Sequence, residues 1–213
     1  MRITLPSGTP AELAVADGAT VGIAMHPDIM GLRPLFDDHC ARLAAEGFTT
    51  CAIEPWPSQE DLPLDKRLQA PLDVDRVLAD LAAAAHATRC ERVGVMGFCM
   101  GGMEAFRAAG TGRFHRAVSF YGMITPPEQW RAPGRDPLDM LGRPEACPTL
   151  AIVGGKDQWA PPPDVEALRR LLNVEVVFYP EAEHGFAHDP ERPAHRPDDA
   201  ADAWRRATEF LRA

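Results

Sequence analysis

The chain has 213 residues, of which 46% are apolar and 25% are charged, as in an ordinary globular protein. Its 22 basic residues stand against 31 acidic ones, and the net charge of −9 argues against nucleic acid or an anionic membrane as a partner, since both bind basic surfaces. The opening segment MRITLPSGTPAEL lacks the apolar core of a signal peptide, and no apolar run reaches the roughly 18 residues of a membrane span. We therefore expect a cytoplasmic protein.

Two kinds of apolar segment alternate along the chain. First, ITL (3–5) and ELAVA (12–16) flank the turn SGTP and predict an antiparallel pair. Short β-branched runs then alternate with segments whose apolar side chains recur at helical spacing. In chain order this predicts strand 20–26, helix 34–46, strand 48–55, helix 74–85, strand 92–97, helix 99–109, strands 115–122 and 148–155, helix 162–172, strand 174–180 and helix 198–212.

This alternation is typical of a parallel sheet that is covered by helices on both faces. Proline-bearing loops are expected before residue 72 and after residue 122, and no linker, repeat or low-complexity segment divides the chain. We therefore predict one α/β domain over residues 1–213. Its central sheet is mostly parallel, and an antiparallel hairpin forms its N-terminal part.

Reactive side chains follow most of the predicted strands. In open α/β sheets, chemistry collects at the carboxyl ends of the strands. A nucleophile, an acid and a histidine occur there in that order along the chain. The reactive residues at strand ends are His26, Asp28, Glu54, Cys99, Tyr121, Asp157, Glu181, Glu183 and His184.

The segment 97–101, Gly-Phe-Cys-Met-Gly, lies where a predicted strand meets a predicted helix. It matches the G-x-S-x-G nucleophile elbow of α/β-hydrolases, with Cys99 in place of serine. Nucleophile, acid and then histidine is also the order of that fold. Five cysteines without CxxC spacing predict neither a disulfide framework nor a zinc site, and of the five only Cys99 is flanked by glycines. The alternative is that Cys99 is a buried cysteine at a tight strand–helix crossing.

The chain resembles the dienelactone hydrolase family, whose members use a cysteine nucleophile on the α/β-hydrolase fold. The resemblance implies that Cys99 is the nucleophile, His184 the base and Asp157 the residue that orients it. It also implies hydrolysis of a small lactone, ester or thioester through an acyl-enzyme, by a monomer without a cofactor. The motifs that carry it are DIMG (28–31), GFCMGG (97–102), FYG (120–122), GGKDQWAPPP (154–163) and EHGFAHD (183–189).

The physical chemistry of a thiol fits these roles. A free cysteine has a pKa of about 8.5, so an adjacent imidazole and the start of a helix would favour the thiolate. The oxyanion is expected at the backbone N–H of Met100, directly after the nucleophile. For the second N–H the resemblance points to Ile29.

Two positions of the family pattern differ here. Asp28 stands where the family carries a carboxylate, typically glutamate, that interacts with the thiol; the alternative is a turn aspartate. His188 stands where the family has a carboxylate-binding arginine, and no residue aligns with the second arginine, although Arg67 lies in that region. A histidine is only partly charged near neutral pH. A neutral or less acidic lactone or ester is therefore expected at least as much as the dienelactone.

Other interpretations remain open at this stage. Phe98, Tyr121, Trp56 and Trp159 line the substrate pocket or belong to the core. The four residues predicted for the pocket are Phe98, Tyr121, Trp159 and His188. Glu181 or Glu183 could replace Asp157 as the acid. The chain could also be a ligand-binding member of the fold without activity, or a thiol redox sensor in which Cys51 or Cys147 resolves oxidised Cys99. A metal site is disfavoured because Pro190 and Pro193 break the helix that would align His184, His188, Asp189, Glu191 and His195.

Overall fold

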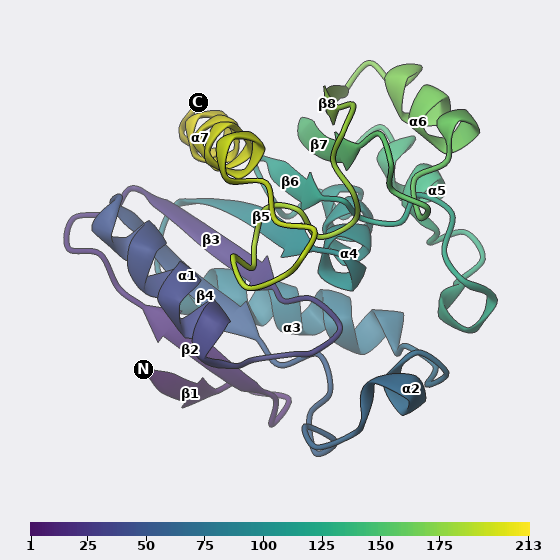
Figure 1. Cartoon of the computed structure of the whole chain (residues 1–213). Helices are drawn as coiled ribbons and strands as arrows, with labels where there is room; N and C mark the ends of the chain where they lie inside the picture. Colours follow the sequence, from purple (N-terminus) through teal and green to yellow (C-terminus); the bar gives the residue numbers. More distant parts are fainter.

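An eight-stranded sheet with the order β1-β2-β4-β3-β5-β6-β7-β8 forms the centre of the computed structural model, which describes residues 1–213 (Figure 1). Its strands are β1 (Arg2–Thr4), β2 (Pro10–Ala14), β3 (Val21–His26), β4 (Phe48–Ile53), β5 (Arg92–Phe98), β6 (Ala117–Phe120), β7 (Thr149–Gly154) and β8 (Val174–Tyr179). All residues of β3, β4, β6 and β7 are buried. Such continuous apolar runs are expected of strands that are covered on both faces.

The direction of the strands agrees with the sequence pattern. β4, β3, β5, β6, β7 and β8 pair in parallel, whereas β1 and β2 are antiparallel to each other and β2 is antiparallel to β4. The predicted α/β fold, with a mostly parallel sheet and an N-terminal antiparallel hairpin, is therefore confirmed.

Helices cover both faces of this sheet; most bury one apolar stripe, whereas all ten residues of α4 are buried. On one face lie α1 (Pro34–Ala45) and α7 (Pro197–Arg212), whose buried side chains share a cluster with β3 and β5. On the other face lie α3 (Val74–Ala87), α4 (Met100–Ala109) and α6 (Pro162–Arg169). Local signals set the helix starts: Pro34 opens α1, and the Asp73 carboxylate accepts a hydrogen bond from the Arg76 N–H at the start of α3.

Both predicted loops contain short helices that the sequence pattern did not predict. They are α2 (Leu64–Arg67), the 3₁₀ helix η1 (Glu128–Trp130) and α5 (Pro137–Leu141). Elements of three to five residues are too short to show a helical period. Distant hydrogen bonds hold the second loop instead, because the buried guanidinium of Arg107 on α4 donates to the carbonyls of Trp130 and Arg135.

The strand order reverses between β3 and β5. From β3 the chain continues through α1 to β4 on one side, whereas β5 pairs with the other side of β3. The carboxyl ends of β3 and β5 are level, since His26 is paired with Gly97. A ligand-binding crevice is expected at such a switch point. The loops that carry Asp28 and Cys99 both begin there.

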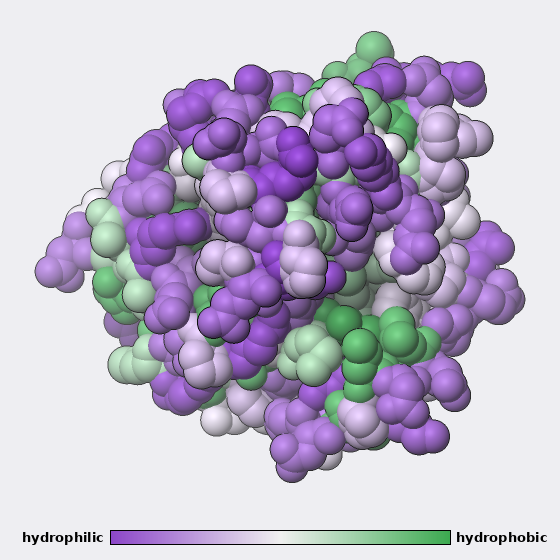
Figure 2. Space-filling view, viewed as in Figure 1, coloured by the Kyte–Doolittle hydropathy of each residue, from purple (hydrophilic) through white to green (hydrophobic).

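Most of the surface in Figure 2 is hydrophilic, but an apolar area lies next to α2. The exposed large hydrophobic side chains include Leu64 and Leu68 at α2 and Met30 in the loop after β3. None of the helices combines the length and the apolar character that crossing a membrane requires.

Candidate active site

Cys99 lies at the sharp turn between β5 and α4. Its backbone angles are φ 56° and ψ −118°, a conformation that costs free energy for any residue with a side chain. The Cys99 N–H donates to the carbonyl of Phe120 at the end of β6 (3.0 Å), which fixes the turn against the neighbouring strand. The side chain is partly exposed, as a nucleophile must be.

Glycines on both sides make this turn possible because backbone segments meet there. A Cβ on Gly97 would lie 1.9 Å from the carbonyl oxygen of Gly101. A Cβ on Gly101 would lie 2.2 Å from the carbonyl oxygen of His26, where β3 ends. Both distances are far below van der Waals contact. The two glycines of the motif therefore allow α4 to start directly above the ends of β5 and β3.

His184 and Asp157 form a hydrogen-bonded pair at the ends of two further strands. Asp157 follows β7 and His184 follows β8, and His184 Nδ1 lies 2.8 Å from Asp157 Oδ2. The other oxygen of Asp157 accepts the backbone N–H of Trp159 (2.8 Å), and this carboxylate is fully buried. Because both of its oxygens are fixed, Asp157 holds the imidazole ring in place through Nδ1. Nε2 is then the ring nitrogen that is left for another group.

Cys99 lies within electrostatic reach of this imidazole. Burial by itself would lower the pKa of His184, but the neighbouring Cys99 sulfur and the Asp157 carboxylate raise it to about 10. Nε2 is buried and has no hydrogen-bond partner in the protein, and the Cys99 sulfur is near enough to raise the pKa of the ring. The arrangement is chemically suited to a thiolate–imidazolium pair.

Two backbone N–H groups near Cys99 are free. Met100 is the first residue of α4, so its N–H has no partner within the helix. The Ile29 N–H, in the loop after β3, has no hydrogen-bond acceptor in the protein. These are the two groups at which the sequence predicts the oxyanion.

Asp28 takes part in a different, buried network. Its carboxylate accepts two hydrogen bonds from Arg33 (2.7 and 2.9 Å) and faces His188 Nε2 at 2.8 Å. His188 Nδ1 in turn lies 2.5 Å from the Tyr121 hydroxyl. Burial would raise the pKa of Asp28, but the bonds from His188 and Arg33 hold it well below its usual range. Both oxygens of Asp28 are thus occupied, and neither is bonded to Cys99.

The protonation state of this network follows from its contacts. Asp28 is ionised, so His188 Nε2 donates to it, and His188 Nδ1 accepts the hydrogen of the Tyr121 hydroxyl. Burial lowers the pKa of His188 and raises that of Tyr121, which keeps both side chains neutral. A neutral, fully engaged His188 cannot replace an arginine as a clamp for a substrate carboxylate.

A cavity of about 490 Å³ opens beside His184. Of the four residues predicted for the substrate pocket, Trp159 lines it, whereas Phe98, Tyr121 and His188 are buried in the core behind the site. The rest of the lining is mostly polar and is formed by Lys156, Gln158, Glu183, His184, Arg192, Pro193 and Ala194.

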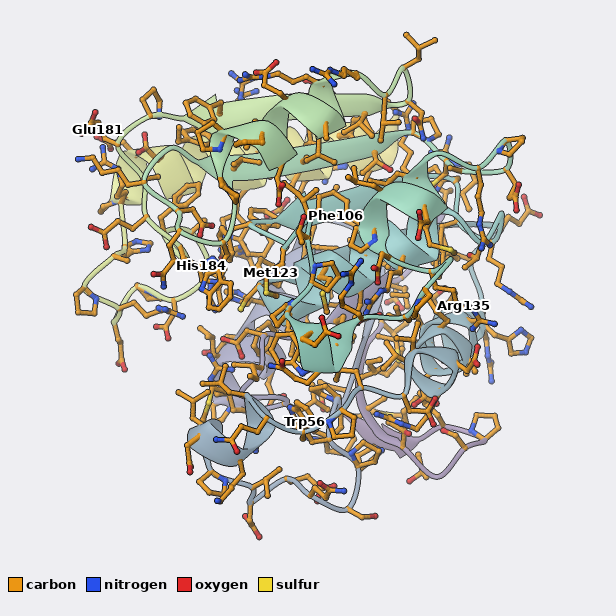
Figure 3. The ribbon with its side chains drawn as sticks, turned by 90° about the vertical axis from the view of Figure 1, so that its right-hand side faces the viewer. Trp56, Phe106, Met123, Arg135, Glu181 and His184 are labelled. Atoms are coloured by element: carbon orange, nitrogen blue, oxygen red, sulfur yellow. The ribbon has the colours of Figure 1, made fainter.

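Strand-end loops from across the sheet meet at this edge. The parallel strands in Figure 1 point to the right, and Figure 3 views the molecule from that side, with Trp56, Met123 and His184 labelled on the loops after β4, β6 and β8. An apolar cluster against Cys99 contains Ile29, Trp56, Met100, Met103, Met123 and Trp130. The Cys99 thiol therefore has apolar side chains on one side.

Two buried residues at this edge, Arg67 and Trp56, have roles that the sequence does not indicate. The guanidinium of Arg67 donates to three backbone carbonyls, those of Glu60, Leu62 and Ile29. The indole N–H of Trp56 also donates to the Ile29 carbonyl (2.8 Å). Arg67 is thus not available to a substrate carboxylate. Its proximity to Ile29 has no signal in the sequence, because the two residues are 38 positions apart.

The other cysteines are poor partners for Cys99 in a redox switch. All five are free thiols, and Cys51 and Cys147 lie buried in the cluster on the α3–α4–α6 face. Burial raises the pKa of Cys51 to about 12 and that of Cys147 to about 11, so neither forms a thiolate readily.

No group of three or more histidine, cysteine or carboxylate side chains is arranged to hold a metal ion.

The fold is that of the α/β-hydrolases. The structure is similar to a crystal structure from Klebsiella pneumoniae subsp. pneumoniae MGH 78578, of a protein assigned as a dienelactone hydrolase. The TM-score is 0.86 and the sequence identity 27%, over 100% of this chain and 97% of that chain. The chain belongs to the dienelactone hydrolase family, which its residues 10–213 match. The predicted family is thus confirmed, and with it the class of ester and lactone hydrolases.

Sequence relatives agree with this placement. A protein of Escherichia coli (strain K12) that is assigned as a carboxymethylenebutenolidase is 32% identical over 92% of this chain and 78% of its own length. A protein of Bradyrhizobium sp that is assigned as a 2-oxo-3-(5-oxofuran-2-ylidene)propanoate lactonase is 31% identical over 93% of this chain and 86% of its own length.

Proposed function

We propose that the chain hydrolyses small esters and lactones through an acyl-enzyme on Cys99. The observation that carries this proposal is the position of Cys99, on a strained turn beside an imidazole whose Nδ1 is 2.8 Å from the Asp157 carboxylate. A nucleophile needs a base within reach and a third group that orients the base. Cys99, His184 and Asp157 meet these requirements.

In the first half of the reaction, Cys99 Sγ bonds to the substrate carbonyl carbon and the π electrons of the carbonyl move to its oxygen. The free N–H groups of Met100 and Ile29 would donate to this oxyanion. When the oxyanion collapses, the carbon–oxygen ester bond breaks and the leaving oxygen takes the proton from His184 Nε2. The product is a thioester on Cys99, which in the case of a lactone keeps the released hydroxyl in the same molecule.

In the second half, water releases the acid. His184 Nε2 takes a proton from the water while its oxygen adds to the thioester carbonyl, and the oxyanion forms again at the same two N–H groups. Collapse now expels the Cys99 thiolate and leaves the imidazolium, which restores the starting pair. Asp157 remains ionised throughout and stabilises the charged imidazole. Atoms balance with water as the only co-substrate.

The lining of the cavity beside His184 favours a substrate that carries a carboxylate. Arg192 lines this cavity, and its guanidinium lies against Gly185, the residue after His184. An arginine holds a carboxylate with two parallel hydrogen bonds and is always charged. The names of both relatives describe five-membered unsaturated lactones, one of them a propanoate. We therefore favour an anionic lactone, held by Arg192 rather than by His188 or Arg67.

The test is turnover of a panel of lactones and activated esters, in which each anionic compound is matched by its neutral methyl ester. Cys99→Ala should abolish hydrolysis, while Cys90→Ala, which removes the other partly exposed thiol, should leave it unchanged. Arg192→Met should raise KM at least tenfold for the anionic lactone and not for the neutral one. Turnover that survives Cys99→Ala, or binding of the panel by the wild type without turnover, would overturn the mechanism.

A further inference from the structure

The peptide between Ile29 and Met30 is held from both sides. Its carbonyl oxygen, that of Ile29, accepts hydrogen bonds from Trp56 Nε1 (2.8 Å) and from Arg67 Nη1 (2.9 Å). Its N–H, that of Met30, donates to Asp28 Oδ1 (2.9 Å). Trp56 and Arg67 are almost completely buried, at 5% and 3% exposure. Two such donors on one loop carbonyl leave this peptide little freedom to rotate.

The preceding peptide, which carries the free Ile29 N–H, lies between two fixed groups. On one side the Asp28 side chain is bonded to Arg33 and His188, and on the other side the Ile29–Met30 peptide is bonded as described. The carbonyl of this peptide, that of Asp28, also accepts the Gly31 N–H (3.1 Å). The direction of the Ile29 N–H therefore depends on this bond together with both anchors. A hydrogen-bond donor that is aimed before the reaction stabilises a developing oxyanion without reorganising.

The loop after β4 is built to support this arrangement. The buried Glu54 carboxylate accepts the Trp56 N–H with one oxygen and the Leu32 N–H with the other, at 2.8 and 2.9 Å. It thereby ties the loop after β4 to the loop after β3. Arg67 donates two further hydrogen bonds to the carbonyls of Leu62 and Glu60, so that its position is set by its own loop.

We propose that Trp56 and Arg67 are positioning residues that aim the Ile29 N–H at the oxyanion. The inference rests on the proposed function, because an oxyanion must form at Cys99 for the direction of this N–H to matter. Neither residue touches the substrate; both act through the Ile29 carbonyl. The β4–α3 loop thus contributes to catalysis rather than only covering the edge of the sheet.

Trp56→Phe and Arg67→Met delete the donors to Ile29 while they keep most of the side-chain volume. Trp130→Phe is the matched control: Trp130 belongs to the same apolar cluster, is 3% exposed and donates its indole N–H to a backbone carbonyl, that of Ala70 (2.9 Å). Loss of a complete oxyanion donor costs about 100- to 1,000-fold in kcat. We expect about a tenfold loss for Trp56→Phe and up to about 100-fold for Arg67→Met, with KM changed less than about twofold.

Alkylation of Cys99 by iodoacetamide separates positioning from general damage. That reaction is a displacement at carbon that places no oxyanion at the Ile29 N–H, so its rate should match the wild type in both variants. Equal losses of alkylation and hydrolysis would mean that the site is distorted, and would overturn the inference. So would a kcat for Trp56→Phe equal to that of Trp130→Phe. Failure of the proposed function would look different, because wild-type turnover would then not depend on Cys99.

Discussion

Asp157→Asn is the substitution that probes the histidine–carboxylate pair most cleanly. Asparagine has nearly the same shape, and its side-chain oxygen can still accept the Trp159 N–H that Asp157 accepts at 2.8 Å. Its amide nitrogen then faces His184 Nδ1 as a donor. The imidazole must respond by carrying its proton on Nε2, where it cannot accept a proton from the Cys99 thiol or from water.

The expected loss of rate has two parts. The rise of the His184 pKa from 6.5 to about 10 corresponds to roughly 5 kcal/mol in favour of the imidazolium. Asp157 shares this effect with the Cys99 sulfur, so its removal forfeits part of this stabilisation of the imidazolium. The wrong tautomer adds a further loss, and in serine enzymes the equivalent change lowers kcat about 10⁴-fold. Because a thiol ionises more readily than a hydroxyl, we expect a total loss of about 10³-fold here.

Steady-state hydrolysis of an activated ester at pH 7.5 measures this loss, with circular dichroism and thermal unfolding as checks of folding. Glu181→Gln is the matched control, since its carboxylate is exposed on the same loop as His184 and does not line the cavity. It should stay within about twofold of the wild type. A folded Asp157→Asn variant within about tenfold of the wild-type kcat, or a comparable loss in Glu181→Gln, would refute the assignment of the acid.

Three further predictions concern protonation, stability and the elbow. In NMR titrations His184 should stay protonated up to a pH of about 10, and Cys99→Ala should lower this pKa because the sulfur is gone; an unchanged pKa would show that the two side chains do not interact. Burial opposes ionisation of Asp28, but hydrogen bonds from His188 and Arg33 keep its folded pKa below the ordinary 3.8, so its stabilisation is complete above that pH and is lost as the pH falls. Asp28→Asn should therefore lower the urea-measured free energy of unfolding by about 3 kcal/mol at pH 7 and by less at pH 3, and equal effects at both would contradict this. Gly97→Ala places a Cβ 1.9 Å from the Gly101 carbonyl oxygen and should cost about 3 kcal/mol or more in thermal unfolding, which an unchanged Tm would disprove.

The strands and long helices could be predicted because their signals are local. The run VGIAMH reads as a strand that is buried on both faces, and it is β3. The cap at Asp73 and the apolar stripe after it mark α3. By contrast, α2 and α5 have four and five residues, and contacts from distant residues stabilise their loops. No residue of η1 or α5 shows that the buried Arg107 of α4 holds their loop. The α2 loop is held by its own Arg67, whose acceptor Ile29 is 38 positions away.

The same distinction applies to the site. Cys99, Asp157 and His184 are among nine candidates because each follows a strand, and parallel pairing brings their loops to one edge. The elbow motif singles out Cys99, whereas the choice of Asp157 and His184 comes from the resemblance to the family. The chain from Asp28 through His188 to Tyr121 was not found. Its two bonds join residues 160 and 67 positions apart, between loops whose relative placement depends on the whole sheet. The sequence therefore predicts His188 as a pocket residue, whereas in the structure it is buried.

Intact mass spectrometry during turnover tests the central claim most directly. The enzyme is mixed with a slowly hydrolysed activated ester, quenched in acid within the first turnovers and digested for peptide mapping. The account predicts a mass increase equal to the acyl group on the peptide that contains Cys99, sensitive to hydroxylamine as a thioester is, and no such adduct in Cys99→Ala. An acyl group on any other residue would contradict this prediction. So would wild-type turnover with no adduct on Cys99 at early times.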